Sequence, residues 1–482
     1  MKAEEMRAEY AVLTRPGNGA GTVPFGEVTV PKVDQGGPLG SGDFTYIDIS
    51  SVDNKQKRIT EYKTLAVEAA PSRAKQRLKF GDVLVSMTRP NLNAVAIVPA
   101  ELDGAVGSTG FHVLRATEGT EPRWLYYAVQ TQAFVSAMSE LVQGALYPAV
   151  RPKDIRAFQI PHPPLDQQKH IVAEIEKQFS RLDEAVANLK RVKANLKRYK
   201  AAVLKAAVEG RLVETEAELA RREGRSHETG EQLLQRILET RRSQWQGKGK
   251  YKEPASPDST GLRELPEGWV WASPAQMSAG EPYSLAIGPF GSSLKVSDYT
   301  TSGMPLVFVR NIRAAMFGGP DTIYVSELKA EDLRAHWVEA GDLLVTKMGD
   351  PPGDVCIYPA HRPPAVITAD CVKLRLGNFV PTQFFAYAIE SDLVHKQILG
   401  ITKGVAQLKV SLGRFGSIAF PLPPIAEQHR IVAEVDRRLS LLRETEAQVD
   451  ANLQRAERLR QSILSRAFNS RMILHDGYPE AA

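Results

Sequence analysis

The chain has 482 residues, of which 43% are hydrophobic and 24% charged, with a formal net charge of +5. This length exceeds one ordinary domain and the composition is that of a globular protein, so we expect several domains with cores of their own. Only Cys356 and Cys371 are present, which excludes a disulfide framework and predicts two reduced core thiols. The sequence offers neither a signal peptide nor a long apolar run, which predicts a cytoplasmic protein without membrane contact.

An internal repeat organises the chain. PPLDQQKHIVAEI, from Pro163, matches PPIAEQHRIVAEV, from Pro423, at seven of thirteen positions and at an offset of 260 residues. The same offset aligns GDVLVS, from Gly81, with GDLLVT, from Gly341. One constant offset over so long a stretch predicts a tandem duplication with little net insertion between these segments.

The first part of each copy predicts a globular domain. Residues 1–164 are rich in Gly and Pro and contain short β-branched runs such as TYIDIS and AVAIVP. Residues 263–424 repeat this composition, with runs such as PLVFVR and DLLVTK. Turn residues bound each run, which is typical of short strands. The expected fold class is therefore α+β, with two globular domains of mixed α and β structure.

The second part of each copy predicts a long helix. Residues 165–210 and 425–472 each follow a double proline and keep apolar residues at heptad spacing. A helix of this length spans roughly 65 Å, and neither domain alone could bury its stripe. We expect the two helices to pair as an antiparallel coiled coil that separates the domains, in a pseudo-twofold arrangement; in the alternative, each helix packs on its own domain. The expected pairing residues are Val172, Ile175, Phe179, Leu182, Val186, Leu189, Val432, Val435, Leu439, Leu442, Val449 and Leu453.

Residues 211–262 lie between the two copies. They contain a charged helical segment, EQLLQRILETRRSQW, followed by QGKGKYKEPASPDSTG. The Gly, Lys, Pro and Ser content of the second stretch predicts a flexible linker. Residues 473–482 are expected to form a loose tail.

No segment carries a convincing catalytic motif. GPFGSS, from Gly288, lacks the Lys-Ser or Lys-Thr of a phosphate-binding loop. DPPG at residues 350–353 is similar to the catalytic tetrapeptide of amino-methyltransferases, but a glycine in fourth place cannot stack on a flipped base. Asp321, Glu327 and Lys329 imitate a nuclease metal site without an equivalent in the first copy. We therefore expect no catalytic, cofactor-binding or metal-binding residues.

Two domains, each closed by a double proline and a long helix, resemble the specificity subunits of type I restriction-modification enzymes. The resemblance covers nearly the whole chain, and LPEGWVW from Leu265 is similar to the usual opening of the second recognition domain. The first domain lacks a clean copy of that opening. The most specific residues are Pro163-Pro164-Leu165 with Gln167-Gln168 and Ile171-Val172, and Pro423-Pro424-Ile425 with Glu427-Gln428 and Ile431-Val432.

The resemblance implies a non-catalytic, sequence-specific DNA-binding subunit. Two target recognition domains would each read one half of a bipartite, asymmetric site on double-stranded DNA, and the helices would set their spacing. Two methyltransferase subunits would dock along the helices, and restriction subunits would join them. S-adenosylmethionine, ATP and magnesium would belong to these partners. Two alternatives stay open: an enzyme that fuses recognition to its own methyltransferase or nuclease, and a coiled-coil adaptor that does not bind DNA.

Base-reading residues are expected on loops, because Arg, Lys, Asn, Gln and Tyr side chains read base edges there. In the first copy, the segments after the GDVLVS strand and after Gly144 offer such residues, and the corresponding places of the second copy offer others. The candidates are Arg89, Asn91, Asn93, Tyr147, Arg151, Lys153, Arg310, Asn311, Lys347, Lys403, Gln407 and Lys409.

Overall fold

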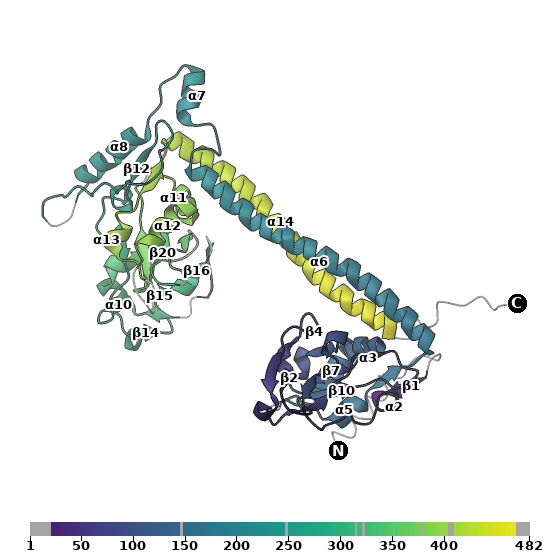
Figure 1. The fold of residues 1–482 in the computed structure, drawn as a ribbon. Helices are drawn as coiled ribbons and strands as arrows, with labels where there is room; N and C mark the ends of the chain where they lie inside the picture. The colour runs from purple at the N-terminus through teal and green to yellow at the C-terminus, as the bar shows by residue number, and fades with distance from the viewer. Residues whose placement is uncertain are drawn as a thin grey trace. The chain divides into compact units, whose positions relative to one another are not determined.

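The chain divides into two compact units, which Figure 1 shows in a computed structural model. Unit 1 comprises residues 1–191 and 449–482, and unit 2 comprises residues 192–448. Each unit combines a domain of strands and short helices with one half of each long helix. The structure describes residues 21–144, 148–245, 249–313, 316–320, 323–349, 351–377, 379–402 and 409–468.

Unit 1 is built on two small sheets. The first has the antiparallel order β10–β7–β8, and the second has the order β5–β2–β9–β6 with one parallel pair, β2 with β9. Two short pairs, β1 with β11 and β3 with β4, complete the strands. The strands are β1 Thr22–Pro24, β2 Asp43–Ile47, β3 Val52–Asp53, β4 Arg58–Ile59, β5 Lys63–Ala66, β6 Ala74–Arg77, β7 Val83–Ser86, β8 Val95–Ile97, β9 Val106–Ser108, β10 Phe111–Leu114 and β11 Gln159–Pro161. The short helices are α2 Phe25–Val28, α3 Pro122–Ala128, α4 Gln132–Glu140 and α5 Pro152–Arg156.

Unit 2 repeats this plan with larger sheets. One has the order β13–β23–β20–β21 and the other the order β14–β18–β15–β22–β19, while β12 pairs with β24 and β16 with β17. The strands are β12 Val270–Ala272, β13 Leu285–Ile287, β14 Tyr299–Thr300, β15 Met304–Val307, β16 Ile312–Arg313, β17 Met316–Phe317, β18 Tyr324–Val325, β19 Trp337–Val338, β20 Leu343–Thr346, β21 Val355–Ile357, β22 Ala365–Ile367, β23 Cys371–Leu374 and β24 Phe420–Leu422. The short helices are α7 Glu216–Glu223, α8 Gly230–Ser243, α9 Pro274–Met277, α10 Glu327–Asp332, α11 Thr382–Glu390, α12 Asp392–Gly400 and α13 Leu412–Phe415.

The predicted duplication is visible in the register of the strands. β7, β8 and β10 recur as β20, β21 and β23, each 260 residues later. The parallel pair of unit 1 aligns Tyr46 with Val106, and that of unit 2 aligns Leu306 with Val366 at the same offset. Two copies of one fold therefore carry different side chains on equivalent backbones, as predicted.

Each copy contains the same buried ion pair. In unit 1, Arg115 donates from Nε and Nη2 to the Asp82 carboxylate at 2.8 and 2.7 Å. In unit 2, Arg375 donates in the same way to Asp342 at 2.7 and 2.8 Å. Both aspartates are buried, and the hydrogen bonds from Arg375 to Asp342 are the main reason that the pKa of Arg375 lies above its usual value. The aspartate of each Gly-Asp dipeptide thus ties the start of one strand to the end of its neighbour.

The two long helices are α6, Leu165–Val208, and α14, Ile425–Phe468, each of 44 residues. In unit 1, Phe179 near the start of α6 shares a buried cluster with Ile463 and Ala467 near the end of α14. The guanidinium of Arg460, on α14, lies 4.2 Å from the centroid of the Phe179 ring. The start of one helix therefore meets the end of the other, so the helices run antiparallel.

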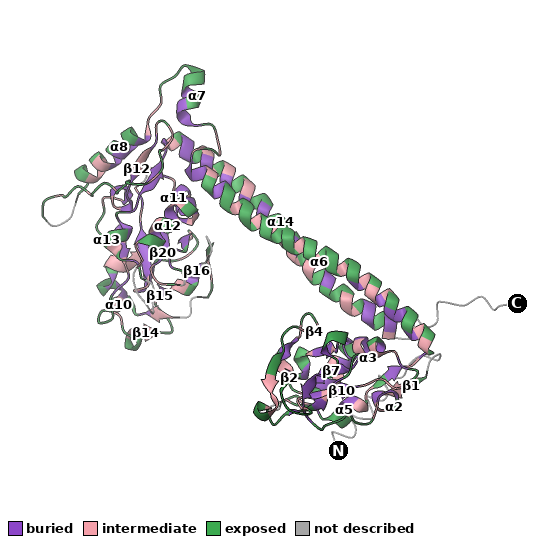
Figure 2. Ribbon diagram, in the orientation of Figure 1, coloured by how far each residue is buried: buried purple, intermediate pink, exposed green. Residues whose placement is uncertain are grey.

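Unit 2 contains the reciprocal contact. Val203 and Ala207, near the end of α6, share a buried cluster with Val435 and Leu439, near the start of α14. Figure 2 shows buried positions along both helices near each domain. The predicted antiparallel pairing is confirmed.

All twelve predicted pairing residues lose contact with solvent wholly or in part. The start of α6 also packs on its own domain, as in the alternative arrangement. Val172 and Ile175 join the same apolar cluster as Trp124 of α3. The buried residues are Val172, Ile175, Phe179, Val435, Leu439, Leu442 and Val449, and the half-buried ones are Leu182, Val186, Leu189, Val432 and Leu453.

The charged helical segment predicted between the two copies forms α8, which packs on unit 2. Thr229 caps α8, whose Leu233, Leu234 and Ile237 are buried in the main apolar cluster of the unit. Further along, the Tyr251 ring lies 5.5 Å from that of Trp245. The predicted helical segment is therefore present, and its apolar face packs in the core of unit 2. The expected tail, residues 473–482, lies outside the described residues.

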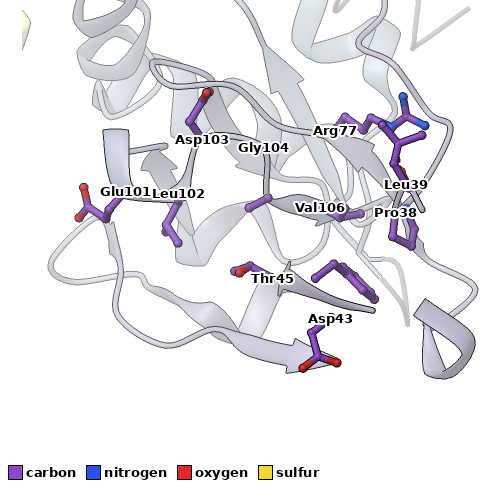
Figure 3. A pocket seen from close by; sticks show the side chains of 13 residues that line it. Pro38, Leu39, Asp43, Thr45, Arg77, Glu101, Leu102, Asp103, Gly104 and Val106 are labelled. Atoms are coloured by element: carbon purple, nitrogen blue, oxygen red, sulfur yellow. Dashed lines mark hydrogen bonds between the residues drawn. The ribbon is translucent and has the colours of Figure 1, made fainter. Parts of the chain in front are cut away.

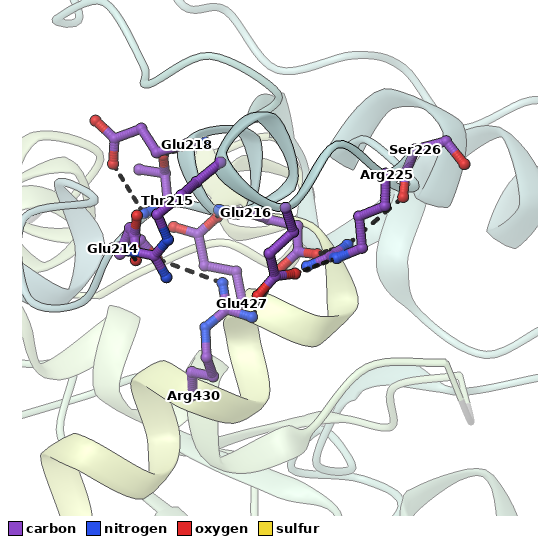
Figure 4. Close-up of polar contacts among 10 residues, drawn as sticks. Glu214, Thr215, Glu216, Glu218, Arg225, Ser226, Glu427 and Arg430 are labelled. Atoms are coloured by element: carbon purple, nitrogen blue, oxygen red, sulfur yellow. Dashed lines mark hydrogen bonds and ion pairs between the residues drawn. The ribbon is translucent and has the colours of Figure 1, made fainter.

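Polar contacts from α7 fix the start of α14 (Figure 4). The Glu216 N–H donates to Glu427 Oε2 at 2.9 Å, and the Glu216 carboxylate pairs with Arg225 and Arg430 at 2.7 and 2.6 Å. Burial raises the pKa of Glu427 to about 7. Burial also acts to raise the pKa of Glu216, but the two arginines outweigh it and hold that pKa below its usual value.

Both cysteines are buried and free, as predicted. Burial raises the pKa of the Cys356 and Cys371 thiols to about 12, so neither is poised to react as a thiolate. Within the described ranges, no helix has the length and apolar character needed to cross a membrane.

Candidate nucleic-acid interface

Two loops that the sequence nominates in unit 1 lie side by side beyond β7. The Val150 N–H donates to the Met87 carbonyl at 2.8 Å, and the Arg89 N–H donates to the Pro148 carbonyl at 2.9 Å. Thr88 and Ala149, between these contacts, form a β-bridge. Residues 87–93 and 148–153 therefore form one surface, the paired loops of unit 1.

Unit 2 contains the same arrangement 260 residues later. The Val410 N–H donates to the Lys347 carbonyl at 3.1 Å, and Met348 forms a β-bridge with Lys409. Residues 347–349 and 409–411 are the paired loops of unit 2. The fold thus brings together, in both units, segments that are about 60 residues apart in sequence and that both carry basic candidates.

The backbone of the unit 1 loop is held in an uncommon conformation. Arg89 and Asn93 have φ angles of 49° and 46°, in the left-handed region that non-glycine residues rarely occupy. Asn93 Nδ2 donates to the Val129 carbonyl at 3.1 Å, and its own carbonyl accepts from Lys57 Nζ at 2.5 Å. Burial lowers the pKa of Lys57 to about 8. Such strain persists only where surrounding contacts enforce it, and it concentrates at binding sites.

The unit 1 candidates separate into two groups. Arg89, Asn91 and Lys153 are exposed on the paired loops. Arg151 is also exposed, but Nε and Nη2 donate to the Asp154 carboxylate at 3.0 and 3.2 Å at the start of α5. Asn93 holds the loop against Val129, as described above. Tyr147 lies outside the described residues.

The unit 2 candidates differ in their surroundings. Lys347 is half-buried, and its Nζ donates to the Ala369 carbonyl at 3.2 Å. Lys409 is exposed. Arg310 is exposed too, with its guanidinium 4.1 Å from the centroid of the Phe308 ring. Lys403 and Gln407 lie outside the described residues.

The prediction that Asn311 reads a base is wrong. This side chain is 3% exposed. Its Oδ1 accepts from the Phe308 N–H at 2.9 Å, and its Nδ2 donates to the Gly318 carbonyl at 3.0 Å. In unit 1 the equivalent residue, Ser51, accepts from the Asp48 N–H at 3.1 Å. Asn311 therefore closes a turn of the fold and is not available to a base.

Sequence reasoning missed the turn between β3 and β4. Lys55 and Gln56 are exposed on it, and Arg58 is exposed at the start of β4. Asn54 lines, together with Arg89, a surface depression of about 380 Å³. The run NKQKR, between two β-branched stretches, was the available signal. This turn adds positive charge and amide groups beside the paired loops of unit 1.

A second hollow in unit 1, of about 340 Å³, has the opposite character (Figure 3). Asp43, Glu101 and Asp103 line it together with a single arginine, Arg77. The Arg77 guanidinium already pairs with Asp34 at 2.7 Å. Because three carboxylates would repel phosphate groups, this hollow is unsuited to a nucleic-acid backbone. Among the residues that the structure describes, no three His, Cys, Asp or Glu side chains lie close enough together to hold a metal ion.

Comparison with known proteins supports the resemblance. Residues 34–198 match the family model described as the type I restriction modification DNA specificity domain. The type I restriction enzyme EcoKI specificity subunit of Escherichia coli (strain K12) is 24% identical over 213 residues. That alignment covers 43% of this chain and 44% of the relative, so it spans less than half of the relative's length.

Solved structures share the fold along most of the chain. A chain from work on complex assembly and conformational transition of the type I R-M system is 23% identical, with a TM-score of 0.68. The alignment covers 95% of this chain and 99% of that one. The HsdS subunit from Thermoanaerobacter tengcongensis is 24% identical with a TM-score of 0.50, over 95% of this chain and 98% of that chain. At these identities the likeness shows the fold, and it confirms the two domains with paired helices. Residues 34–198 thus match the type I restriction modification DNA specificity domain, and the chain is similar over most of its length to solved chains of type I restriction-modification systems.

Proposed function

We propose that this chain is the DNA-reading subunit of a type I restriction-modification system, and that each unit reads one half of a bipartite, asymmetric site. The observation that carries this proposal is the recurrence of the paired loops beyond β7 and β20, in one register but with different side chains. Equivalent backbones with different side chains suit two half-sites of different sequence.

Exposed and half-buried side chains of the paired loops have base-reading chemistry. In unit 1, Arg89 and Lys153 suit guanine and Asn91 suits adenine; in unit 2, Lys347 and Lys409 suit guanine or phosphate. The turn that carries Lys55 and Arg58 adds phosphate contacts beside Arg89. Phosphate contacts supply affinity and base contacts supply discrimination, so both kinds are needed on one surface.

Catalysis would come from partners. Two methyltransferase subunits would bind along α6 and α14, whose outward faces are polar and exposed between the buried seam positions. Restriction subunits would join that complex. S-adenosylmethionine, ATP and magnesium would be bound by those subunits, and this chain would perform no chemical step. The family resemblance supports this division of labour.

The proposal is tested by selection from a library of random DNA duplexes at moderate salt, using the full chain with its methyltransferase subunits. We expect enrichment of one motif in two parts separated by unspecified bases. If no motif is enriched, the chain is an adaptor that does not read DNA. A second arm incubates the chain alone with labelled S-adenosylmethionine and DNA. Methyl transfer there would show a fused enzyme and contradict the proposal.

A further inference from the structure

Each unit carries one copy of a short motif that the 260-residue offset does not align. GPLGSG at residues 37–42 and GPFGSS at residues 288–293 share four of six positions at an offset of 251. We call these segments the GP loops. Each presents a large apolar residue to solvent: Leu39 is 71% exposed and Phe290 is 64% exposed. A large apolar side chain is thus exposed at the tip of one such loop in each unit.

The GP loops are anchored to the sheets. In unit 2, the Gly288 N–H donates to the Cys371 carbonyl at 3.2 Å, and a Cβ at Gly288 would lie 2.1 Å from the Thr368 carbonyl oxygen. Only glycine allows this approach. In unit 1, the Gly37 N–H donates to the Lys75 carbonyl at 2.9 Å, and Figure 3 shows Leu39 beside Arg77. The apolar tips are therefore displayed by fixed backbone.

Phe290 adjoins the paired loops of unit 2. Lys347 Nζ lies 5.3 Å from the centroid of the Phe290 ring and donates to the carbonyl of Ala369, the neighbour of Thr368. An aromatic ring and an ammonium group thus share one edge of the candidate interface. The ammonium and the exposed Lys409 give this edge a charge complementary to phosphate.

We propose that Phe290 is an apolar DNA contact, whose ring enters a groove and partly unstacks one base step in the half-site read by unit 2, while Lys347 neutralises a neighbouring phosphate. Apolar wedges on DNA-binding proteins act in this way. This inference rests on the proposed function, because it requires that unit 2 bind DNA.

The test measures binding and base stacking together. The full chain, with its methyltransferase subunits, is titrated with duplexes that carry the selected motif. 2-Aminopurine, which fluoresces more strongly when unstacked, replaces one base at a time in the unit 2 half-site, but never the methylated adenine, which the methyltransferase would itself unstack.

We expect the wild-type complex to raise the fluorescence at one step. Phe290→Ala should abolish this rise and weaken specific binding by about tenfold, as loss of a base–aromatic contact does. Phe290→Trp should retain both. Leu328→Ala removes an equally exposed apolar side chain, 80% exposed on α10 of the same unit, and should change neither. Since the Phe290 ring is exposed, the thermal unfolding of Phe290→Ala should match that of the wild type.

If Phe290→Ala left the DNA affinity and the fluorescence unchanged while the wild-type complex still selected its motif, the inference would be overturned. The proposed function would then still stand. Weaker assembly with the methyltransferase, at unchanged DNA affinity of the assembled complex, would overturn it in favour of a protein contact. A wild-type complex without any sequence preference would instead contradict the proposed function itself.

Discussion

Glu427 and Gln167 occupy the same position at the starts of the two long helices, yet only one of them titrates. Burial raises the pKa of Glu427 to about 7, whereas an unfolded glutamate titrates near 4.3. Between these values the folded chain holds a proton that the unfolded chain releases. The free energy of unfolding should therefore fall as the pH rises through this window, and the loss is complete above about pH 7.

Glu427→Gln copies the residue of the first helix and removes this titration. We expect the variant to unfold at a higher temperature than the wild type at pH 8 and at a similar temperature at pH 5. Thermal unfolding of the full chain at the two pH values measures the difference. Glu444→Gln, at an exposed site on the same helix, is the control. An equal gain at both pH values would contradict the explanation.

The buried Asp82–Arg115 ion pair should contribute more to the free energy of unfolding than an exposed ion pair does. Asp82→Ala leaves the Arg115 guanidinium, which is about one-fifth exposed, without its bidentate partner. Breaking a buried pair from one side costs about 3 kcal/mol. Lys63→Ala removes an exposed partner of Asp48 and should cost under about 1 kcal/mol. Urea unfolding compares the two, and equal losses would show that the Asp82 pair contributes no more than a surface pair.

Among the elements, the long helices were the most predictable. An apolar stripe kept over 44 residues has few solutions, so the pairing and its residues followed from spacing alone. Helix α8 carries the same kind of signal in Leu233, Leu234 and Ile237, and it was predicted as a helical segment but not as part of the core of unit 2. A single short amphipathic face does not identify the core that receives it.

Loops were predicted less well, for identifiable reasons. Pairing of the two nominated segments depends on β-bridges between distant residues, which no local pattern records. Asn311 has a type of side chain that suits both a base contact and a turn, and only its burial distinguishes these roles. The GP loops escaped alignment because the second copy has nine more residues between its GP loop and β15, a stretch that contains β14.

Buried residues in the seam between α6 and α14 should stabilise the fold. Leu439→Ala removes a buried side chain that unit 2 packs between α14 and its neighbours, and should cost about 2 to 4 kcal/mol. Ser440→Ala, at the next and exposed position, should cost almost nothing. The two variants are compared by urea unfolding. Similar urea midpoints for Leu439→Ala and Ser440→Ala would show that Leu439 does not belong to a packed seam.

The duplication of the whole chain bears directly on how it would recognise DNA. The modest net charge of +5 does not by itself indicate DNA, and the inference depends on where the basic residues lie. Both copies place them on the paired loops. Two domains that share one fold but differ in side chains should recognise two different half-sites. A substitution in one domain should therefore leave recognition by the other unchanged.

The most direct test is a genome-wide map of methylated adenines in cells that carry the wild-type chain, Arg89→Ala or Lys409→Ala. We expect a motif in two parts for the wild type. Arg89→Ala should relax specificity in one half and Lys409→Ala should weaken or relax recognition of the other, because loss of one base contact costs about 1 to 3 kcal/mol at its own position. A contiguous motif, or two variants that alter the same half, would contradict it.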